Sequence, residues 1–472
     1  MFGRRYHGSA RGVTALALVC IVGLAACGGS ASTATPVSSL PSAQPSASTP
    51  SAAAPSASSA GGSAACQPSS GKVTLTFWSW MPGIDKIVAE WNKANPDIQV
   101  DVKVVVQGNA GDYDNIANAL KAGNAPDMAM IEQDVLPSFR LQDGLADISG
   151  CDFVAAAQSA FVPYAWSMVT MGGDGVYGLP TDLGPLVMYY RKDLFAKWGI
   201  SVPTTWDEYY QAAQMIKAKD STVSITDVAL GAAWMTGLAW QNGAKPIQIS
   251  GNTVKLDYTG AATSQVAAYW QKLIDEKLVR TDLAGFSPAE FAALNNGTLA
   301  TQISAVWDAG IIAGNAKSTA GDWAVAPLPQ WQAGASASGN YGGSTTAVLK
   351  SSQHPYEAAK FALWLSTDPA AQSMVVSLAG GYPPTTAGQD LAQLKTGDPF
   401  YGGQVIYDVV KAASQGVNPD WQWSPNQRTI NKILGDEITK VLGGQETFQA
   451  ALQATQDKAL ADLKSLGIAT AP

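Results

Sequence analysis

Two carboxylates, Glu132 and Asp134, come directly after a short apolar segment at 127–131 that is predicted to be a strand. Open α/β folds place their ligands at the carboxyl end of such strands. A carboxylate in that position can accept hydrogen bonds from the hydroxyl groups of a ligand. We therefore expect one of these side chains to face a ligand cleft and the other to lie at the surface.

Aromatic side chains would supply the apolar part of such a site, because ligand pockets are lined mainly by apolar and aromatic side chains with a few polar groups. All 15 tryptophans follow the first 65 residues. Several aromatic residues lie at predicted strand ends or in loops between helices, where side chains often bind. These candidates are Trp80, Trp234, Trp240, Tyr382, Trp421 and Trp423. For most of them the alternative is a place in the core.

A glycine pair offers a further polar contact. Gly342, Gly343 and Ser344 could present backbone N–H groups to ligand oxygens, since glycine allows close approach. No Lys-Ser or Lys-Thr pair follows the glycines directly, which argues against a phosphate loop. We therefore include Gly343 and Ser344 among the binding candidates.

The scarcity of histidine excludes several kinds of enzyme. His7 lies near the N-terminus, and His354 precedes Pro355 at a predicted helix start. A multi-histidine metal site is impossible, and a nucleophile paired with histidine would depend on His354 alone. We therefore expect no catalytic residue, no metal and no cofactor. A glycosidase using Glu132 and Asp182 needs no histidine and is the alternative from another class.

The N-terminus has the pattern of an export signal. Three arginines, with no acidic residue, accompany an apolar run at 13–24, and small residues then lead to Cys27. The pattern resembles a bacterial lipoprotein signal, in which residues 1–26 are removed and Cys27 becomes a lipid-carrying N-terminus. We then expect the protein on the extracytoplasmic face of the cell membrane, held by its lipid alone.

The segment after Cys27 has no capacity to form a core. Residues 28–65 contain no charged and no aromatic side chain and are mostly Ser, Ala, Pro, Gly and Thr. Such a composition cannot bury enough apolar surface to offset the entropy of ordering. We interpret 27–70 as the lipidated cysteine and a disordered tether. A more specific alternative is that this segment is an O-glycosylated stalk.

Two cysteines, Cys66 and Cys151, remain after processing. Their spacing matches no metal motif, and the expected compartment is oxidising. A disulfide between them would attach the end of the tether to the first domain. Two free thiols are the alternative.

The charge and length of the mature chain limit its partners. Removing the three signal arginines leaves 26 basic and 37 acidic residues, a net charge of −11. An acidic chain without a basic cluster argues against nucleic acid and anionic lipid as partners. The part from 71 to 472 is long enough for two domains.

The order of predicted elements indicates an α/β fold. Alternating apolar residues predict strands at 73–77 and 98–106, while helical spacing is found at 84–91 and around 116–120. Together with the segment at 127–131 this gives strand, helix, strand, helix, strand, which is typical of a largely parallel sheet. Later signals are capping boxes at 205–208 and 287–290, a helix stop at Gly297, a strand at 299–303, and helices at 357–365 and 429–441.

Four segments in this order resemble the family 1 extracellular solute-binding proteins of ABC importers, which include maltose-binding proteins. They are 76–98, 125–147, 178–208 and 296–344, with Gly178-Leu179-Pro180-Thr181-Asp182 and Tyr189-Tyr190-Arg191-Lys192-Asp193 as the clearest motifs. Thr181 and Arg191 depart from the usual motif, in which an apolar residue and Asn or Asp stand at these positions. The resemblance covers nearly all of 71–450.

The resemblance implies a type II periplasmic-binding-protein fold. Each of its two α/β lobes would have a mostly parallel sheet flanked by helices, with the ligand cleft between them. Lobe I would comprise 71–181 plus 308–346, and lobe II 182–307 plus 347–472. The chain would cross between lobes near Asp182, Trp307 and Ala347, and hinge closure would accompany binding.

The resemblance also implies a function and two central site residues. A monomeric binding protein would capture a carbohydrate, expected to be an oligosaccharide, and deliver it to the permease subunits of an ABC importer. Trp307 would stack on the ligand, and Asp182 at the first crossing would accept hydroxyl hydrogen bonds. The alternatives are packing in the hinge for Trp307 and a turn or cap for Asp182. Another small polar solute is the alternative ligand.

Overall fold

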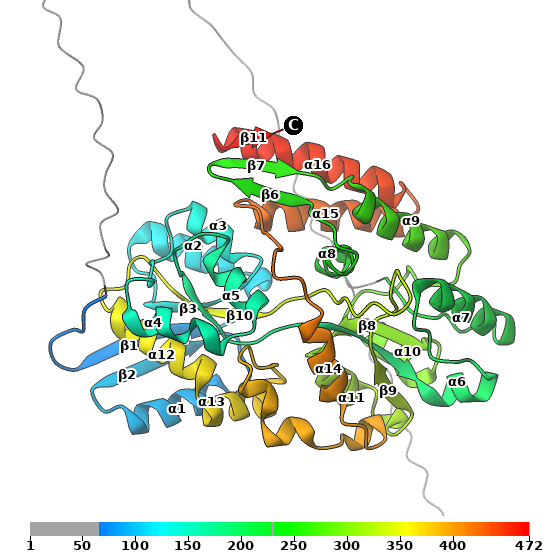
Figure 1. The fold of residues 1–472 in the computed structure, drawn as a ribbon, viewed down its shortest axis with the longest axis horizontal. Helices are drawn as coiled ribbons and strands as arrows, with labels where there is room; N and C mark the ends of the chain where they lie inside the picture. Colours follow the sequence, from blue (N-terminus) through cyan, green and yellow to red (C-terminus); the bar gives the residue numbers. More distant parts are fainter. Residues whose placement is uncertain (1–65, 229–230, 472) are drawn as a thin grey trace, which may run out of the picture. The chain divides into compact units, whose positions relative to one another are not determined.

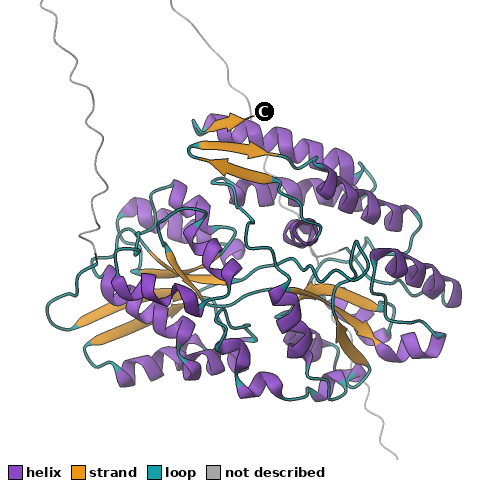
Figure 2. Cartoon of the chain, in the orientation of Figure 1, coloured by secondary structure: helices purple, strands orange, loops and turns teal. Residues whose placement is uncertain are grey.

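The computed structural model describes residues 66–228 and 231–471. The expected signal peptide, Cys27 and nearly all of the expected tether lie outside the described residues. Within the described part, two groups of helices surround separate sheets, and a third small sheet lies beside the C-terminal helices (Figures 1 and 2).

The first sheet has five strands in the order β2-β1-β3-β10-β4. Its strands are β1 (Val73–Ser79), β2 (Ile98–Val104), β3 (Met128–Glu132), β4 (Gly178–Pro180) and β10 (Ser344–Val348). β1 alternates buried and exposed residues, whereas the central strand β3 is apolar and buried from Met128 to Ile131. A strand with neighbours on both sides and covered faces needs such a continuous apolar run.

Among the described residues, seven α-helices surround the first sheet, and we call the sheet together with these helices lobe I. They are α1 (Ile84–Ala94), α2 (Asp112–Ala122), α3 (Leu136–Leu141), α4 (Asp152–Ala157), α5 (Pro163–Thr170), α12 (Pro355–Thr367) and α13 (Pro369–Met374). Trp91 of α1 and Phe361 of α12 meet edge to face in its core, with ring centroids 5.4 Å apart. The packing brings together segments that are far apart in sequence.

The second sheet has three strands in the order β8-β5-β9. They are β5 (Leu186–Arg191), β8 (Thr301–Ala305) and β9 (Trp323–Ala326). We call the surrounding helices and this sheet lobe II. The helices are α6 (Lys192–Trp198), α7 (Trp206–Lys219), α8 (Gly231–Gln241), α9 (Ala261–Asp275), α10 (Pro288–Asn296), α11 (Asp308–Asn315), α14 (Ile406–Gln415), α15 (Gln427–Leu442) and α16 (Phe448–Ser465).

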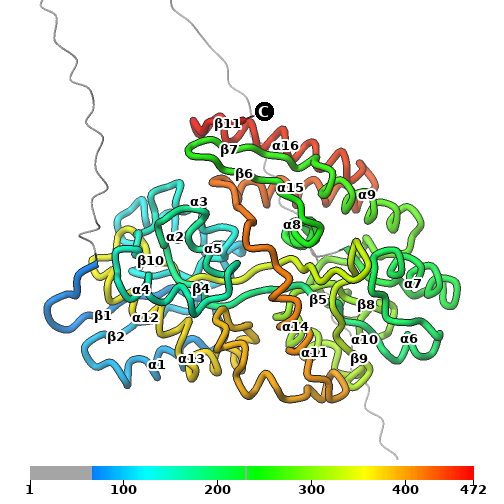
Figure 3. Tube along the Cα trace, viewed as in Figure 1, coloured from blue at the N-terminus to red at the C-terminus, as the bar shows by residue number. Residues whose placement is uncertain are grey.

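The third sheet is a hairpin extended by the C-terminus. β6 (Ile247–Ser250) pairs antiparallel with β7 (Thr253–Leu256), and β11 (Ala469–Ala471) pairs parallel with β7. The tube in Figure 3 shows these strands beside α9, α15 and α16. This sheet therefore fixes the end of the described chain onto lobe II.

Local signals were reliable guides to the helix ends. The predicted capping box at the start of α7 is present, since the Thr205 and Glu208 side chains each accept a backbone N–H. At α10 the Ser287 hydroxyl accepts the N–H of Glu290, and Gly297 ends the helix with a φ of 70°. At α10 the Glu290 side chain also accepts the backbone N–H of Phe286.

The strand directions differ from the expectation of a mostly parallel sheet in each lobe. β1 runs parallel to β2 and β3, but β10 runs antiparallel to both β3 and β4. Both pairings of β5, with β8 and with β9, are antiparallel. Apolar patterning shows that a segment is a buried strand, but it carries no mark of the direction in which that strand enters the sheet.

The assignment of the segments 308–346 and 347–472 to the two lobes also differs from the expectation. β9 joins β5 in lobe II, whereas β10 enters the sheet of lobe I between β3 and β4. α12 packs into the core of lobe I. The chain therefore returns to lobe I near Ser344, and not near Trp307. Strands of four or five buried residues look alike in sequence, whichever sheet they join.

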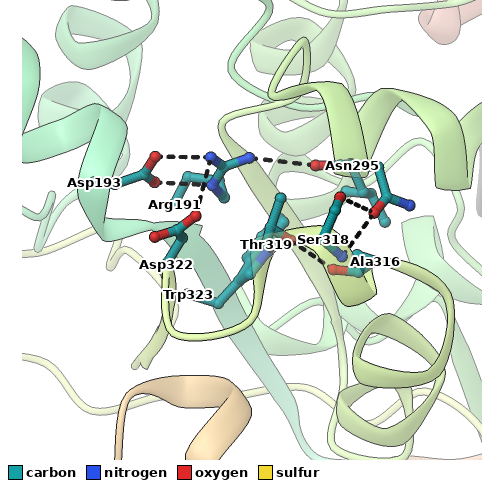
Figure 4. Close-up of polar contacts among 9 residues, drawn as sticks. Arg191, Asp193, Asn295, Ala316, Ser318, Thr319, Asp322 and Trp323 are labelled. Atoms are coloured by element: carbon teal, nitrogen blue, oxygen red, sulfur yellow. Dashed lines mark hydrogen bonds and ion pairs between the residues drawn. The ribbon is translucent and has the colours of Figure 1, made fainter.

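Arg191, a departure from the family motif, anchors the end of β5 (Figure 4). Its buried guanidinium donates to both carboxylate oxygens of Asp193, at 2.8 and 2.7 Å, and to the Leu294 carbonyl oxygen at 3.3 Å. Asp322 lies 3.7 Å from the same group. Because a fork-shaped cation can satisfy several acceptors at once, Arg191 ties β5, α10 and the turn before β9 together.

Two further features bear on the earlier expectations. In the structure Cys66 and Cys151 are joined by a disulfide with a sequence separation of 85. Among the helices at 66–228 and 231–471, none has the length and apolar content that crossing a bilayer requires.

Candidate functional site

A cavity of about 660 Å³ separates the carboxyl end of β3 from α15. Its volume lies within the range of sites for small organic ligands. Glu132 and Asp134 line it from lobe I, and Tyr341 and Gly342 line it from the segment that leads into β10. The complete lining is Gln107, Asn109, Glu132, Asp134, Ala232, Ala233, Tyr341, Gly342, Arg428, Thr429, Asn431, Lys432 and Gly435.

Glu132 is held by a dense set of donors. Oε1 accepts from Gln107 at 3.1 Å, and Oε2 accepts from Asn109 at 2.9 Å and from the Tyr113 hydroxyl at 3.0 Å. The Tyr113 oxygen in turn accepts the backbone N–H of Glu132 at 2.9 Å. Gly108 lies so close to the Tyr113 ring that any Cβ there would overlap it. The loop after β2 therefore presents Gln107 and Asn109 to the cavity in fixed positions.

The electrostatics of this carboxylate are unusual. Burial, followed by the nearby charge of Asp134, raises the pKa of Glu132 to about 8. Burial also raises the pKa of Asp134. The two carboxyl groups titrate as a pair, because ionising one makes ionising its neighbour less favourable. Near neutral pH the cavity wall can thus offer both a hydrogen-bond donor and acceptors to a ligand.

Helix α15 approaches lobe I at the same cavity. Asn431 donates to Oδ2 of Asp134 at 2.6 Å, and the Arg428 guanidinium pairs with Asp114 at 2.7 Å. The backbone N–H of Arg428 also donates to the Ser138 hydroxyl at 3.1 Å. The apolar residues of α15, such as Ile430 and Leu434, lie in the core of lobe II. These contacts connect the two lobes along one side of the cavity.

Asp182 and Ser344 lie where two chain segments cross. The Ser344 backbone N–H donates to Oδ1 of Asp182 at 2.6 Å, and burial raises the pKa of Asp182 to about 6. Gly343, with a φ of 92°, accepts the Gln133 backbone N–H through its carbonyl. Ser344 thus engages Asp182 through its side chain as well as its backbone N–H, and Asp182 is not among the residues that line the cavity.

Trp307 lies between β8 and α11 of lobe II and contacts Tyr341 of the cavity wall. Its indole N–H donates to the Tyr341 carbonyl at 2.9 Å, and the two rings meet edge to face with centroids 5.1 Å apart. The crossing is tight, since a Cβ on Gly184 would lie 1.9 Å from the Tyr341 carbonyl oxygen and 3.1 Å from the Trp307 indole nitrogen. Trp307 is half-buried, so its edge is fixed while part of the ring remains open.

Trp80 contacts the site indirectly, through Tyr113. Its ring meets Tyr113 edge to face at 5.8 Å, and Tyr113 is the residue that holds Glu132. Trp80 is half-buried and is not among the residues that line the cavity. The loop after β1 therefore reaches the site through Tyr113.

The remaining aromatic candidates lie in packed positions. Trp234 is buried, its N–H donates to the Ile303 carbonyl, and its ring packs on Trp270. Trp240 and Trp421 stack with centroids 4.7 Å apart and an interplanar angle of 12°. Sequence placed these residues in loops or a second aromatic wall, but their apolar rings instead fill the core of lobe II.

Tyr382 and Trp423 show the same tendency. Tyr382 is fully buried and stacks on Tyr407 with an angle of 7°. Trp423 is half-buried, and its N–H points to the sulfur of Met168. Neither residue lines the cavity with Glu132. Trp423 instead lines a separate cavity, together with Ile249 and Ile468.

Sequence reasoning missed most of the polar lining. Gln107 and Asn109 follow β2 as Glu132 follows β3, so the strand-end argument could have found them. Arg428, Asn431 and Lys432 fall at helical spacing on α15. The pattern showed a polar helix face, but not that this face meets lobe I. In the described part of the chain, no three His, Cys, Asp or Glu side chains gather as metal ligands do.

The fold and the site together define a two-lobe α/β binding protein with a polar cavity between its lobes. The family model for bacterial extracellular solute-binding proteins matches residues 78–372. This chain belongs to that family.

Relatives cover most of the chain. The arabinooligosaccharide-binding protein of Bacillus subtilis (strain 168) is 26% identical over 367 residues, or 74% of this chain and 83% of the relative. A binding protein associated with an ABC transporter of B. animalis subsp. lactis Bl-04, solved with β-1,6-galactobiose, is 30% identical. It covers 85% of this chain and 100% of its own, with a TM-score of 0.74.

A second solved structure is similar to the same extent. The galacto-N-biose/lacto-N-biose I-binding protein of Bifidobacterium longum, solved with lacto-N-biose, is 27% identical with a TM-score of 0.76. It covers 85% of this chain and all of its own. Both structures have the two-lobe architecture expected from the sequence motifs.

Proposed function

We propose that this protein captures an oligosaccharide outside the cell and delivers it to the permease subunits of an ABC importer. The observation that carries the proposal is the cavity in which Glu132, Asp134 and several amides lie near the Trp307–Tyr341 aromatic pair. Carboxylates and amides suit ligand hydroxyls, and aromatic faces suit sugar C–H groups. The relatives named above support a sugar ligand, since one is an arabinooligosaccharide-binding protein and two were solved with β-1,6-galactobiose and lacto-N-biose.

Each site residue has a proposed role. Glu132 and Asp134 bind ligand hydroxyls, and Trp307 stacks on a sugar face. Asp182, whose first oxygen accepts the Ser344 N–H, offers its second oxygen to the ligand. Closure about the crossing segments near Asp182 and Ser344 then surrounds the sugar. We propose that the protein acts as a monomer, without a cofactor.

The test of this function is calorimetry with arabinooligosaccharides, β-1,6-galactobiose and lacto-N-biose. At least one should bind at one ligand per chain, and saturation at 100 times the dissociation constant should add about 2.7 kcal/mol of stability. Trp307→Ala should weaken that binding about tenfold or more, since it removes roughly 50–100 Å² of apolar contact. Absence of binding to every sugar, with binding of a polyamine or amino-acid derivative instead, would contradict the sugar proposal.

We also propose that the protein has no catalytic activity. Glu132 and Asp182 carry raised pKa values, a property that a glycosidase acid can share, and this observation keeps hydrolysis as the second candidate. Incubation with the bound sugar distinguishes the two. A binding protein leaves the sugar intact at any time, whereas release of shorter products in excess of the protein would establish hydrolysis.

Cys27 is proposed as the lipid-carrying residue that attaches the protein to the membrane. Two or more acyl chains are needed for stable anchoring. Cys27→Ser should therefore move the protein from the membrane fraction to the medium, or leave the signal uncleaved. Fractionation with mass spectrometry of the N-terminus measures this. Full membrane retention of correctly cleaved Cys27→Ser protein would rule out the lipid as the sole anchor.

A further inference from the structure

Phe286, on the turn before α10, has a conformation that its local sequence does not favour. The turn is closed by the Ser287 N–H, which donates to the Ala284 carbonyl at 3.2 Å. Phe286 occupies the third position of this turn with a φ of 58°, where glycine or asparagine is usual. A bulky residue there is an outlier, and such strain persists only when the surroundings hold it.

A buried carboxylate holds Phe286 in this position. The Phe286 backbone N–H donates to Oε2 of Glu290, whose other oxygen accepts from the Gln302 side chain at 3.0 Å. Glu290 is only 1% exposed, although it lies in the first turn of α10. A buried carboxylate is costly unless its oxygens are satisfied, so this bond fixes the backbone of the turn.

The strained turn leaves the Phe286 ring in the open. The side chain is 40% exposed, which is high for phenylalanine. Its ring contacts Trp307, with centroids 5.8 Å apart and an interplanar angle of 47°. Trp307 contacts Tyr341, which lines the cavity. Phe286, Trp307 and Tyr341 therefore form a row of three rings that begins at the cavity and ends at an exposed ring.

We propose that Phe286 is a further ligand-contacting residue, which stacks on a sugar unit beyond those held in the cavity, and that Glu290 positions it. The inference rests on the proposed function. Phe286 is at the outer end of the row, so it contacts a unit that only longer oligosaccharides possess. The site thus favours chains longer than a disaccharide. This role explains the unfavourable backbone conformation of Phe286, because that conformation keeps the ring out of the protein core and available to the ligand.

The test is calorimetry with arabinooligosaccharides of two to five units on the parent, Phe286→Ala, Phe286→Gly and Phe286→Tyr. Both smaller variants should bind the longest chains about tenfold more weakly and the disaccharide nearly as well as the parent. Phe286→Tyr keeps the ring and should retain the parent affinity. Leu466→Ala, which truncates an exposed apolar residue at the end of α16, is the matched control and should change nothing.

Thermal unfolding without sugar separates this role from a structural one. Phe286→Gly relieves the positive φ, so its melting temperature should equal or exceed that of the parent while its affinity for long chains falls. Unchanged affinity for every chain length would overturn the inference and leave the proposed function standing. Weakened binding together with a lower melting temperature in both Phe286→Gly and Phe286→Ala would overturn it as well. A parent that binds no sugar removes the proposed function, and with it this inference.

Discussion

Replacing Cys66 and Cys151 together with alanine should lower the free energy of unfolding by about 4 kcal/mol. The disulfide closes a loop with a sequence separation of 85, so its removal lets the unfolded chain gain much conformational entropy. Both cysteines are buried in the core of lobe I, and alanine leaves no new polar group there. Urea unfolding of the purified protein measures the change.

Reduction provides the matched control for this prediction. A reducing agent should destabilise the parent by a similar amount and leave the double alanine variant unaffected. The segment that the bond secures also has other ties, since Ser69 contacts Glu357 and His354. Equal stability of parent and variant would mean that these polar contacts, and not the disulfide, hold the start of the folded chain.

The stability of the protein should fall as the pH rises from about 4 to about 8, and Glu132 should cause part of that fall. Its pKa is raised to about 8 in the folded protein, against about 4.3 in an unfolded chain. Between these values the folded state binds more protons than the unfolded state, so raising the pH favours unfolding. Above the pKa of the folded state this loss of stability is complete, and below the pKa of the unfolded state none of it has occurred.

Glu132→Gln should make this dependence shallower. A full proton difference corresponds to about 1.4 kcal/mol per pH unit, and a carboxyl group open to the cavity should give roughly half of that. Between pH 5.5 and 7.5 the parent should therefore lose about 1–2 kcal/mol more than the variant. Urea unfolding at both pH values gives the difference, and Glu208→Gln, at an exposed carboxylate with a lowered pKa, is the control. Parallel profiles for parent and Glu132→Gln would show that Glu132 is ionised throughout this range.

Local patterns in the sequence were sufficient to predict helices and strands, but not to predict how these elements assemble into sheets and lobes. The alternation in β1, the helical spacing of α1 and the cap at Thr205 are properties of neighbouring residues, and they gave these elements correctly. The sheet that β9 joins depends on contacts between Trp323 and Arg191, far apart in sequence. Nothing in four buried residues specifies such a partner.

The same distinction between local pattern and assembly applies to the residues of the site. Glu132 and Asp134 could be predicted because a strand end places them at the sheet edge. The expectation that one of them would lie at the surface was wrong, since both line the cavity and neither is exposed. Asn431 and Arg428 could not, since their contacts with Asp134 and Asp114 require α15 to approach lobe I. Trp234 and Trp240 show the opposite error. Tryptophan serves a ligand face and a core equally well, and only burial distinguishes the two.

The position of β10 between β3 and β4 has a consequence for the order in which the nascent chain can fold. β1 begins at Val73, but the strand that completes the middle of its sheet begins only at Ser344. Until that strand has been synthesised, one side of β3 has no partner, and an open strand edge invites pairing with other chains. The N-terminal lobe therefore cannot finish folding first. A chain truncated before Val348 should aggregate, and the full chain should remain unfolded during export until most of it has emerged.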